Sequence, residues 1–121
     1  MTAYAVAHLR SVDQNAEIVE YLRRIDATLE PFAGRFVVHG VLPDVLEGEW
    51  PGVLVVIGFP DLTAARAWYD SPAYQEILPL RTRNSDGVAF LVDGVPAGYR
   101  AAGYAEKLVG SSARASGTPG R

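Results

Sequence analysis

Residues 52–75 decide the fold, and they read GVLVVIGF (52–59), PDL (60–62), TAARAWYD (63–70) and SPAYQ (71–75). The run 53–59 is apolar or small, holds four β-branched residues and is bounded by Pro-Gly before and Pro-Asp after. This composition and length favour a strand covered on both faces. Asp61 is a typical helix N-cap, and apolar residues then recur at helical spacing over 62–69. We predict a strand that leads directly into a helix folded back over it.

The length and composition fit a single folded domain. The chain has 121 residues, of which 49% are hydrophobic and 21% charged, as in ordinary globular proteins. From residue 110 onward the sequence is small and polar, with little to bury. We therefore expect one domain over residues 1–109 and a disordered tail over residues 110–121.

Several classes of partner and chemistry are disfavoured. The net charge of −3 and the lack of a basic run argue against nucleic acid and anionic membranes as partners. No stretch approaches the roughly 20 apolar residues of a membrane span, and the first residues do not read as a signal peptide. We expect a cytoplasmic protein. The absence of cysteine excludes disulfides and thiolate nucleophiles.

The rest of the chain alternates between strand and helix patterns. We predict strands at Ala3–Arg10, Arg35–Val41 and Val88–Val92, a helix over Ala16–Pro31, and a second helix interrupted at Ser71-Pro72. Gly34 is expected to close the first helix, and residues 84–87 to form a turn.

Strand alternation assigns faces to the side chains. One face of the first strand carries alanines, which would accept a closely packed helix. In the second strand, Phe36 and Val38 fall on one side and Arg35, Val37 and His39 on the other, with a bulge or bend at Gly40.

This order predicts an α+β fold of the ferredoxin-like βαββαβ type: a four-stranded antiparallel sheet, in the order four-one-three-two, with two helices on one face. The other sheet face would then be uncovered and largely apolar. Apolar surface of that extent marks association, so we expect a homodimer formed by face-to-face packing of two sheets.

Four segments carry a family resemblance: Gly34 to Phe36, Glu47 to Trp50, the strand ending at Phe59-Pro60, and Trp68 to Tyr74. In order and spacing, residues 2–94 resemble the domain of unknown function 1330 family of the dimeric α+β barrel superfamily. The resemblance implies a ferredoxin-like homodimer with a cavity between sheet and helices or inside the joint barrel. Wider relatives include cofactor-free monooxygenases, isomerases and cyclases. The chain has Ala33 where the family tends to have glycine.

The predicted catalytic residues are His8, Arg35 and His39. Histidine exchanges protons near neutral pH, and a guanidinium can stabilise an oxyanion. The alternative is that both histidines are hydrogen-bonded at a dimer interface and Arg35 pairs across the sheet edge. One strand separates the two histidines and neither has a carboxylate partner, so we predict no metal site. The sequence has no phosphate-binding or dinucleotide-binding motif, so we predict no cofactor.

A second set of residues would bind a small apolar or aromatic ligand. It consists of Tyr4, Trp50, Phe59, Trp68, Tyr69, Tyr74 and Arg81. Trp68 and Tyr69 could instead be core residues, and Arg81 could serve the C-terminal end of its helix.

The favoured function is a small-molecule enzyme without metal or organic cofactor, performing proton transfer, cyclisation or isomerisation, or cofactor-free oxygenation. The first alternative is a homodimer that binds a ligand without transforming it. The second is a structural dimer whose interface is packed solid.

Overall fold

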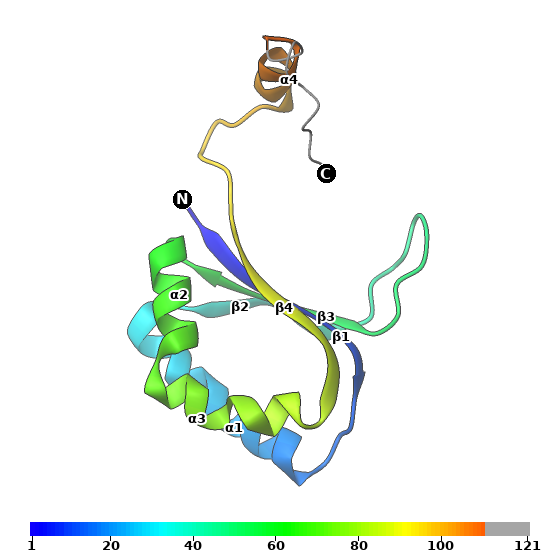
Figure 1. The fold of residues 1–121 in the computed structure, drawn as a ribbon, viewed down its shortest axis with the longest axis vertical. Coiled ribbons are helices and arrows are strands. Elements are labelled where there is room, and N and C mark those ends of the chain that lie inside the picture. Colours follow the sequence, from blue (N-terminus) through cyan, green and yellow to red (C-terminus); the bar gives the residue numbers. More distant parts are fainter. Residues whose placement is uncertain (111–121) are drawn as a thin grey trace.

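The structure is a computed structural model, and it describes residues 1–110. The elements run in the order β1 (Ala3–Val12), α1 (Ala16–Leu29), the 3-10 turn η1 (Glu30–Phe32), β2 (Arg35–Val41), β3 (Val53–Phe59), α2 (Leu62–Asp70), α3 (Pro72–Thr82), β4 (Ser85–Asp93) and α4 (Ala101–Gly110) (Figure 1). Of the predicted disordered tail, residues 111–121 lie outside the described residues.

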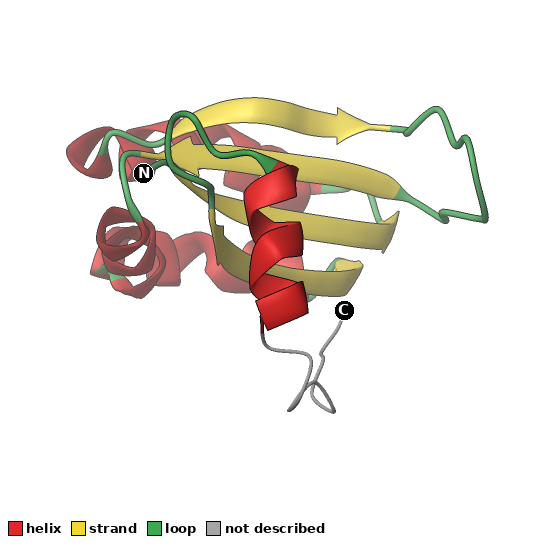
Figure 2. Cartoon of the chain, turned by 90° about the horizontal axis from the view of Figure 1, so that it is seen from above, coloured by secondary structure: helices red, strands yellow, loops and turns green. Residues whose placement is uncertain are grey.

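The four strands form one antiparallel sheet in the order β2-β3-β1-β4. Helices α1, α2 and α3 all lie on one side of this sheet, and its other face is open (Figures 1 and 2). The predicted ferredoxin-like α+β fold and strand order are confirmed. Within residues 1–110, no helix combines the length and apolar character needed to cross a membrane.

The core lies between the helices and one end of the sheet, and Trp68 is at its centre. The Trp68 ring packs against Phe59 and Tyr74, with centroid separations of 5.4 and 4.1 Å. Its indole N–H donates to the Thr28 hydroxyl at 3.0 Å, and that hydroxyl donates to the Ile25 carbonyl at 2.7 Å. The buried polar groups of this cluster are therefore paired, as burial requires.

Side-chain caps fix where the helices begin. Asp61 accepts from the Ala64 N–H at 2.8 Å, as its place after the central strand predicts. Ser71 accepts from the Tyr74 N–H at 3.3 Å, and Pro72 occupies the first position of α3. The predicted interruption at Ser71-Pro72 is confirmed, and it directs Tyr74 toward α1.

The end of the first helix differs from the prediction. Ala33, not Gly34, adopts the left-handed conformation that closes it, with φ of 57°. Gly34 meets a packing requirement, because a Cβ atom there would come within 2.6 Å of the Phe59 ring and 2.8 Å of Leu29. A glycine is needed at 34 for close approach, not for backbone conformation.

The predicted faces of β2 are wrong beyond Phe36. Its pairing with β3 skips Val37 and then Gly40, so β2 contains two bulges. Phe36 pairs with Ile57 and His39 with Val55, which puts both side chains on the helix-facing side of the sheet. Arg35 pairs with Gly58 on the opposite side. A bulge shifts the alternation by one residue, and the bulge at Gly40, whose φ is +63°, agrees with the prediction there.

The C-terminal part of the fold contains two further differences. Strand β4 starts at Ser85, where a turn was predicted, and its Asp86 pairs with Arg10 at 3.1 Å. Residues 95–110 were expected to form no helix or strand, but residues 101–110 form α4. This helix stands apart from the rest of the fold (Figure 1), and all of its residues are exposed.

Candidate functional site

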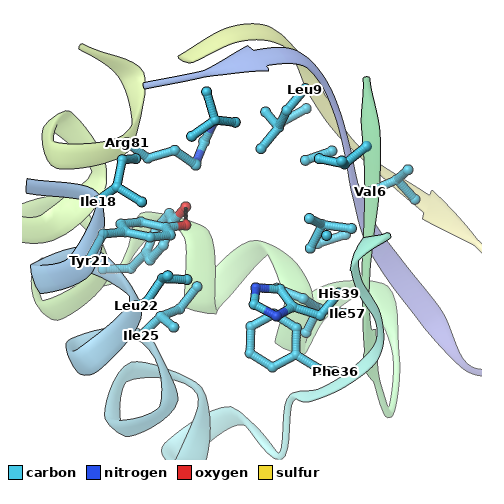
Figure 3. Close-up of a pocket in the computed structure, with 18 of the residues that line it drawn as sticks. Val6, Leu9, Ile18, Tyr21, Leu22, Ile25, Phe36, His39, Ile57 and Arg81 are labelled. Carbon is cyan, nitrogen blue, oxygen red and sulfur yellow. Dashed lines mark hydrogen bonds between the residues drawn. The ribbon is translucent and has the colours of Figure 1, made fainter. Parts of the chain in front are cut away.

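A cavity of about 960 Å³ lies between the sheet and helices α1 and α3 (Figure 3). Its sheet side includes Ala5 and Ala7 of β1 and Ala89 of β4. The alanine face was expected to accept a closely packed helix, and it does so only at its start, where Ala3 is completely buried and α2 packs against β1. Beside Ala5 and Ala7 the short side chains border open space instead.

The cavity opens between α1 and the edge strand β2. Leu22 lines the cavity but remains 42% exposed. His39 lies across from it on β2 and is exposed, with its ring centroid 4.7 Å from that of Phe36. A ligand entering here would pass His39 before it reached the buried helix wall.

The polar groups of the helix wall are concentrated in one cluster. The hydroxyls of Tyr21 on α1 and Tyr74 on α3 are hydrogen-bonded at 2.7 Å. The Arg81 guanidinium lies 5.9 Å from the centroid of the Tyr21 ring, and its side chain extends into the cavity (Figure 3). Residues from both ends of α3 thus meet one residue of α1 at a single place.

Burial sets the protonation of this cluster. The pKa of Tyr21 is raised, first because burial disfavours a phenolate and second because Tyr74 is adjacent. Burial alone would lower the pKa of Arg81, but its interactions with Tyr74 and Tyr21 outweigh burial and raise it. The cluster therefore presents a neutral phenol beside a permanent positive charge.

The charged side chains that line the cavity are all arginines within the described residues 1–110: Arg10, Arg66 and Arg81. Arg10 is neutralised by Asp86. The ion pairs found in this part of the chain do not include Arg81. Arg66 is absent from these ion pairs too, but it is exposed, whereas Arg81 is partly buried. Arg81 is therefore the positive charge on the helix wall that interacts most strongly with a ligand, since charges interact more strongly in a partly buried site than in water.

The structure separates the predicted site residues into two groups. Those that line the cavity are His39, Trp68, Tyr69, Tyr74 and Arg81. Those that do not are Tyr4, His8, Arg35, Trp50 and Phe59.

His8 belongs to the open face of the sheet. Its Nε2 donates to the Pro51 carbonyl, and its ring lies 3.9 Å from that of Trp50. Val6, two residues earlier, also points away from the cavity (Figure 3). Arg35 and Tyr4 both pair with Gly58, on this same open side.

Phe59 is 2% exposed and packs under Gly34 and against Trp68, so it is a core residue. Tyr21 was not among the site residues predicted from the sequence. The signal was present: Tyr21 is three residues after Ile18 and four before Ile25. Among residues 1–110, no three His, Asp or Glu side chains gather closely enough to hold a metal ion.

The family model described as "Domain of unknown function (DUF1330)" matches residues 2–95. The chain belongs to the DUF1330 family. The match covers β1 through β4, and with them every residue of the cavity, but not α4. The resemblance inferred from the sequence is confirmed.

Solved structures show the same fold at low sequence identity. A dimeric ferredoxin-like protein of unknown function from Jannaschia sp. CCS1 is 15% identical, with 79% of this chain and 100% of that chain covered and a TM-score of 0.58. A protein of unknown function from Rhodopseudomonas palustris is 15% identical, with 78% and 83% covered and a TM-score of 0.54.

A third structure, a dabb family protein with a ferredoxin-like fold from Mesorhizobium loti, is 15% identical, with 80% of this chain and 98% of that chain covered and a TM-score of 0.51. No curated protein matches the chain. At these identities the likeness supports the fold of this DUF1330 member and leaves its activity to be argued from the site.

Proposed function

We propose that this DUF1330 member is a small-molecule enzyme that holds a mainly apolar substrate in the cavity and acts without a metal or organic cofactor. The observation that carries the proposal is the cavity itself: about 960 Å³, mostly apolar, with the polar groups of Tyr74 and Arg81 converging at Tyr21. Apolar walls with a few convergent polar groups are typical of ligand sites.

The chemistry that fits these residues is proton transfer next to a carbonyl. His39 would accept a proton from the carbon beside the carbonyl, and the electron pair would move onto the carbonyl oxygen. Arg81 and the tyrosine hydroxyls would stabilise the resulting oxyanion. The enolate would then take a proton at another carbon, an isomerisation, or attack a second carbonyl of the same molecule, a cyclisation. Oxygenation of the same enolate would require dioxygen as a second substrate.

These roles belong to His39 and Arg81 in the proposal because both line the cavity. His8 and Arg35 were predicted from the sequence as catalytic residues together with His39, and a role for those two residues stays a prediction. A ligand-binding protein without catalysis is the second candidate. It is favoured by the exposure of His39 at the mouth, where water would compete for the transferred proton.

Two measurements test the proposal. Isothermal titration with 2-naphthol, an apolar bicyclic compound, should show one site per chain. The variant Ala7→Phe fills the sheet side of the cavity and should weaken binding by at least about tenfold. Ala27→Leu, a similar enlargement at an exposed position of α1, should leave it unchanged. Equal binding by wild type and Ala7→Phe would rule out the cavity as the site.

Catalysis is tested by NMR, as exchange of the protons next to the carbonyl of 2-tetralone in deuterated water. Wild type should accelerate the exchange, His39→Ala should lose most of the acceleration, and His8→Ala should retain it. Binding without accelerated exchange would favour the non-catalytic candidate. If only His8→Ala lost the acceleration of exchange, the catalytic residue would be His8, on the open face of the sheet.

We also propose that the protein forms a homodimer through the open face of its sheet. Val88 and Phe90 of β4 are 49% and 48% exposed there, although both are large and apolar. Val6, Leu54 and Val56 of the central strands continue the same surface. A face of this kind is costly to leave in water, and a second copy would cover it. His8 and Arg35 would then lie at the interface.

A further inference from the structure

We infer that the cavity takes an apolar ring compound that binds as an oxyanion, with its charged oxygen against the Arg81 guanidinium and the Tyr21 and Tyr74 hydroxyls. This inference rests on the proposed function, because it names the substrate class for the same cavity. Three observations carry it.

The first observation is that the Arg81 side chain is not needed to cap the carbonyl groups at the end of its own helix. It lies in the last turn of α3, where a cation can cap carbonyl groups. Here the Arg81 carbonyl already accepts from the Ser85 hydroxyl at 2.7 Å and the Asn84 N–H at 3.0 Å. The Leu80 carbonyl accepts from the Asn84 side chain at 2.8 Å. The Arg81 guanidinium is therefore available to bind a group in the cavity.

The second observation is a charge that no acidic side chain balances. Neither Asp nor Glu lines the cavity within residues 1–110, and the ion pairs of that part of the chain do not include Arg81. Arg10, at another part of the lining, shows the contrast, since Asp86 binds it through both carboxylate oxygens at 3.1 and 3.2 Å. Removing a cation from water without a partner is unfavourable, and an anionic ligand would supply that partner.

The third observation is a spare hydrogen-bond donor. The two hydroxyls of Tyr21 and Tyr74 carry two protons, and one of them lies between the oxygens. The other can be donated to a third acceptor. Burial raises the pKa of Tyr21, so its phenol stays protonated and able to donate. A guanidinium and a phenol side by side match an oxyanion better than a neutral carbonyl.

The part of the cavity beside this cluster indicates the polarity and size of the rest of the ligand. Val55 and Ala7 on the sheet side and Ile25 on the helix side present aliphatic surface only. The volume of about 960 Å³ lies at the upper end of ligand pockets, which suits two or three fused rings. The ligand is thus flat and apolar over most of its area and charged at one oxygen.

The test compares 2-naphthoate with 2-naphthamide, which has the same shape but no charge. Titration of wild type should give at least about tenfold tighter binding of the naphthoate. In Arg81→Gln that preference should vanish, because naphthoate affinity falls far more than naphthamide affinity. Arg23→Gln, at an exposed position of α1, should keep the wild-type preference.

The outcomes separate this inference from the proposed function. Equal affinity of wild type for both compounds would overturn the oxyanion inference and leave the cavity as a ligand site. Retention of the preference in Arg81→Gln would also overturn it. If neither compound bound, the proposed function would fail as well. Should Arg81→Gln not fold, NMR of wild type with 13C-labelled arginine provides the second measurement: naphthoate, but not naphthamide, should shift the Arg81 guanidinium signal, and no shift would contradict the inference.

Discussion

Ala33 holds a left-handed backbone conformation, with φ of 57°, at the end of η1. This conformation costs a residue with a Cβ about 1 kcal/mol or more, and glycine is free of that cost. Ala33→Gly should therefore raise the free energy of unfolding, by up to about 1 kcal/mol once the larger entropy of an unfolded glycine is counted. Urea titration would measure it.

The matched control for Ala33 is Ala27→Gly. Ala27 lies at an exposed position inside α1, where glycine lowers stability by about 1 kcal/mol. The two substitutions are chemically identical and should have opposite signs. A loss of stability in both would show that Ala33 is not strained.

Tyr21 should make stability fall at high pH. Its folded-state pKa is raised above the value of about 10 that an unfolded tyrosine has, because burial disfavours the phenolate. The stabilisation is complete below that pH and is lost as the pH rises beyond it, at up to about 1.4 kcal/mol per pH unit. Between pH 8 and 11, wild type should lose roughly 1 kcal/mol more than Tyr21→Phe. Urea unfolding at both pH values measures the difference.

Tyr104→Phe provides the control for this pH effect. Tyr104 is 53% exposed on α4, so its removal should not alter the pH dependence. If wild type and Tyr21→Phe declined in parallel above pH 10, the buried hydroxyl pair would not be what the structure describes.

The role of a residue could be predicted from the sequence where it depends on neighbours in the chain. It could not be predicted where it depends on packing between distant segments. Asp61 and Ser71 cap helices because a cap needs only the next three residues. Arg81 and Tyr74 were singled out from the sequence and both line the cavity, but that they meet Tyr21 depends on how α3 packs on α1. No local pattern carries that information.

At the scale of elements, Asn84 joins the start of α1 to the end of α3. Its side-chain oxygen accepts from Asn15 at 2.6 Å, and its side-chain N–H groups donate to Glu17 and the Leu80 carbonyl, both at 2.8 Å. Asn84→Ala would remove both partly buried bonds, those to Glu17 and to the Leu80 carbonyl, and leave that carbonyl without its side-chain donor. It should lower the free energy of unfolding by about 1–3 kcal/mol.

The comparison variant is Arg83→Ala, which removes the neighbouring contact of α1 with α3. The pair of Arg83 with Glu17, at 2.8 Å, is exposed at both ends and should contribute under about 1 kcal/mol. Arg83 and Asn84 together lower the pKa of Glu17, so both variants should raise it in an NMR titration. Equal stability losses in the two variants would contradict the ranking.

The element boundaries of β2 and β3 were predicted to the residue, because glycine and proline bound both strands. The face of His39 was not, because simple alternation cannot register the bulge at Val37. That one skipped residue moves His39 from the open face to the cavity.

At the scale of the molecule, the open sheet face should govern assembly. Phe90→Glu would place a charge within the proposed interface and should convert the dimer to a monomer, as measured by analytical ultracentrifugation. Leu62→Glu adds the same charge at an exposed site of α2 and should leave the dimer intact. A wild-type protein that sediments as a monomer, or a Phe90→Glu variant that remains dimeric, would reject this interface.

The central claim is that the space between the sheet and helices α1 and α3 is a ligand site whose charged anchor is Arg81. A crystal structure of wild type grown with 2-naphthoate tests it most directly. We predict the rings between Ala7 and Ile25 and the carboxylate within hydrogen-bonding distance of Arg81 and a tyrosine hydroxyl. The contrary result would be a cavity closed by the side chains around it, or naphthoate bound elsewhere while Arg81 turns away from the cavity.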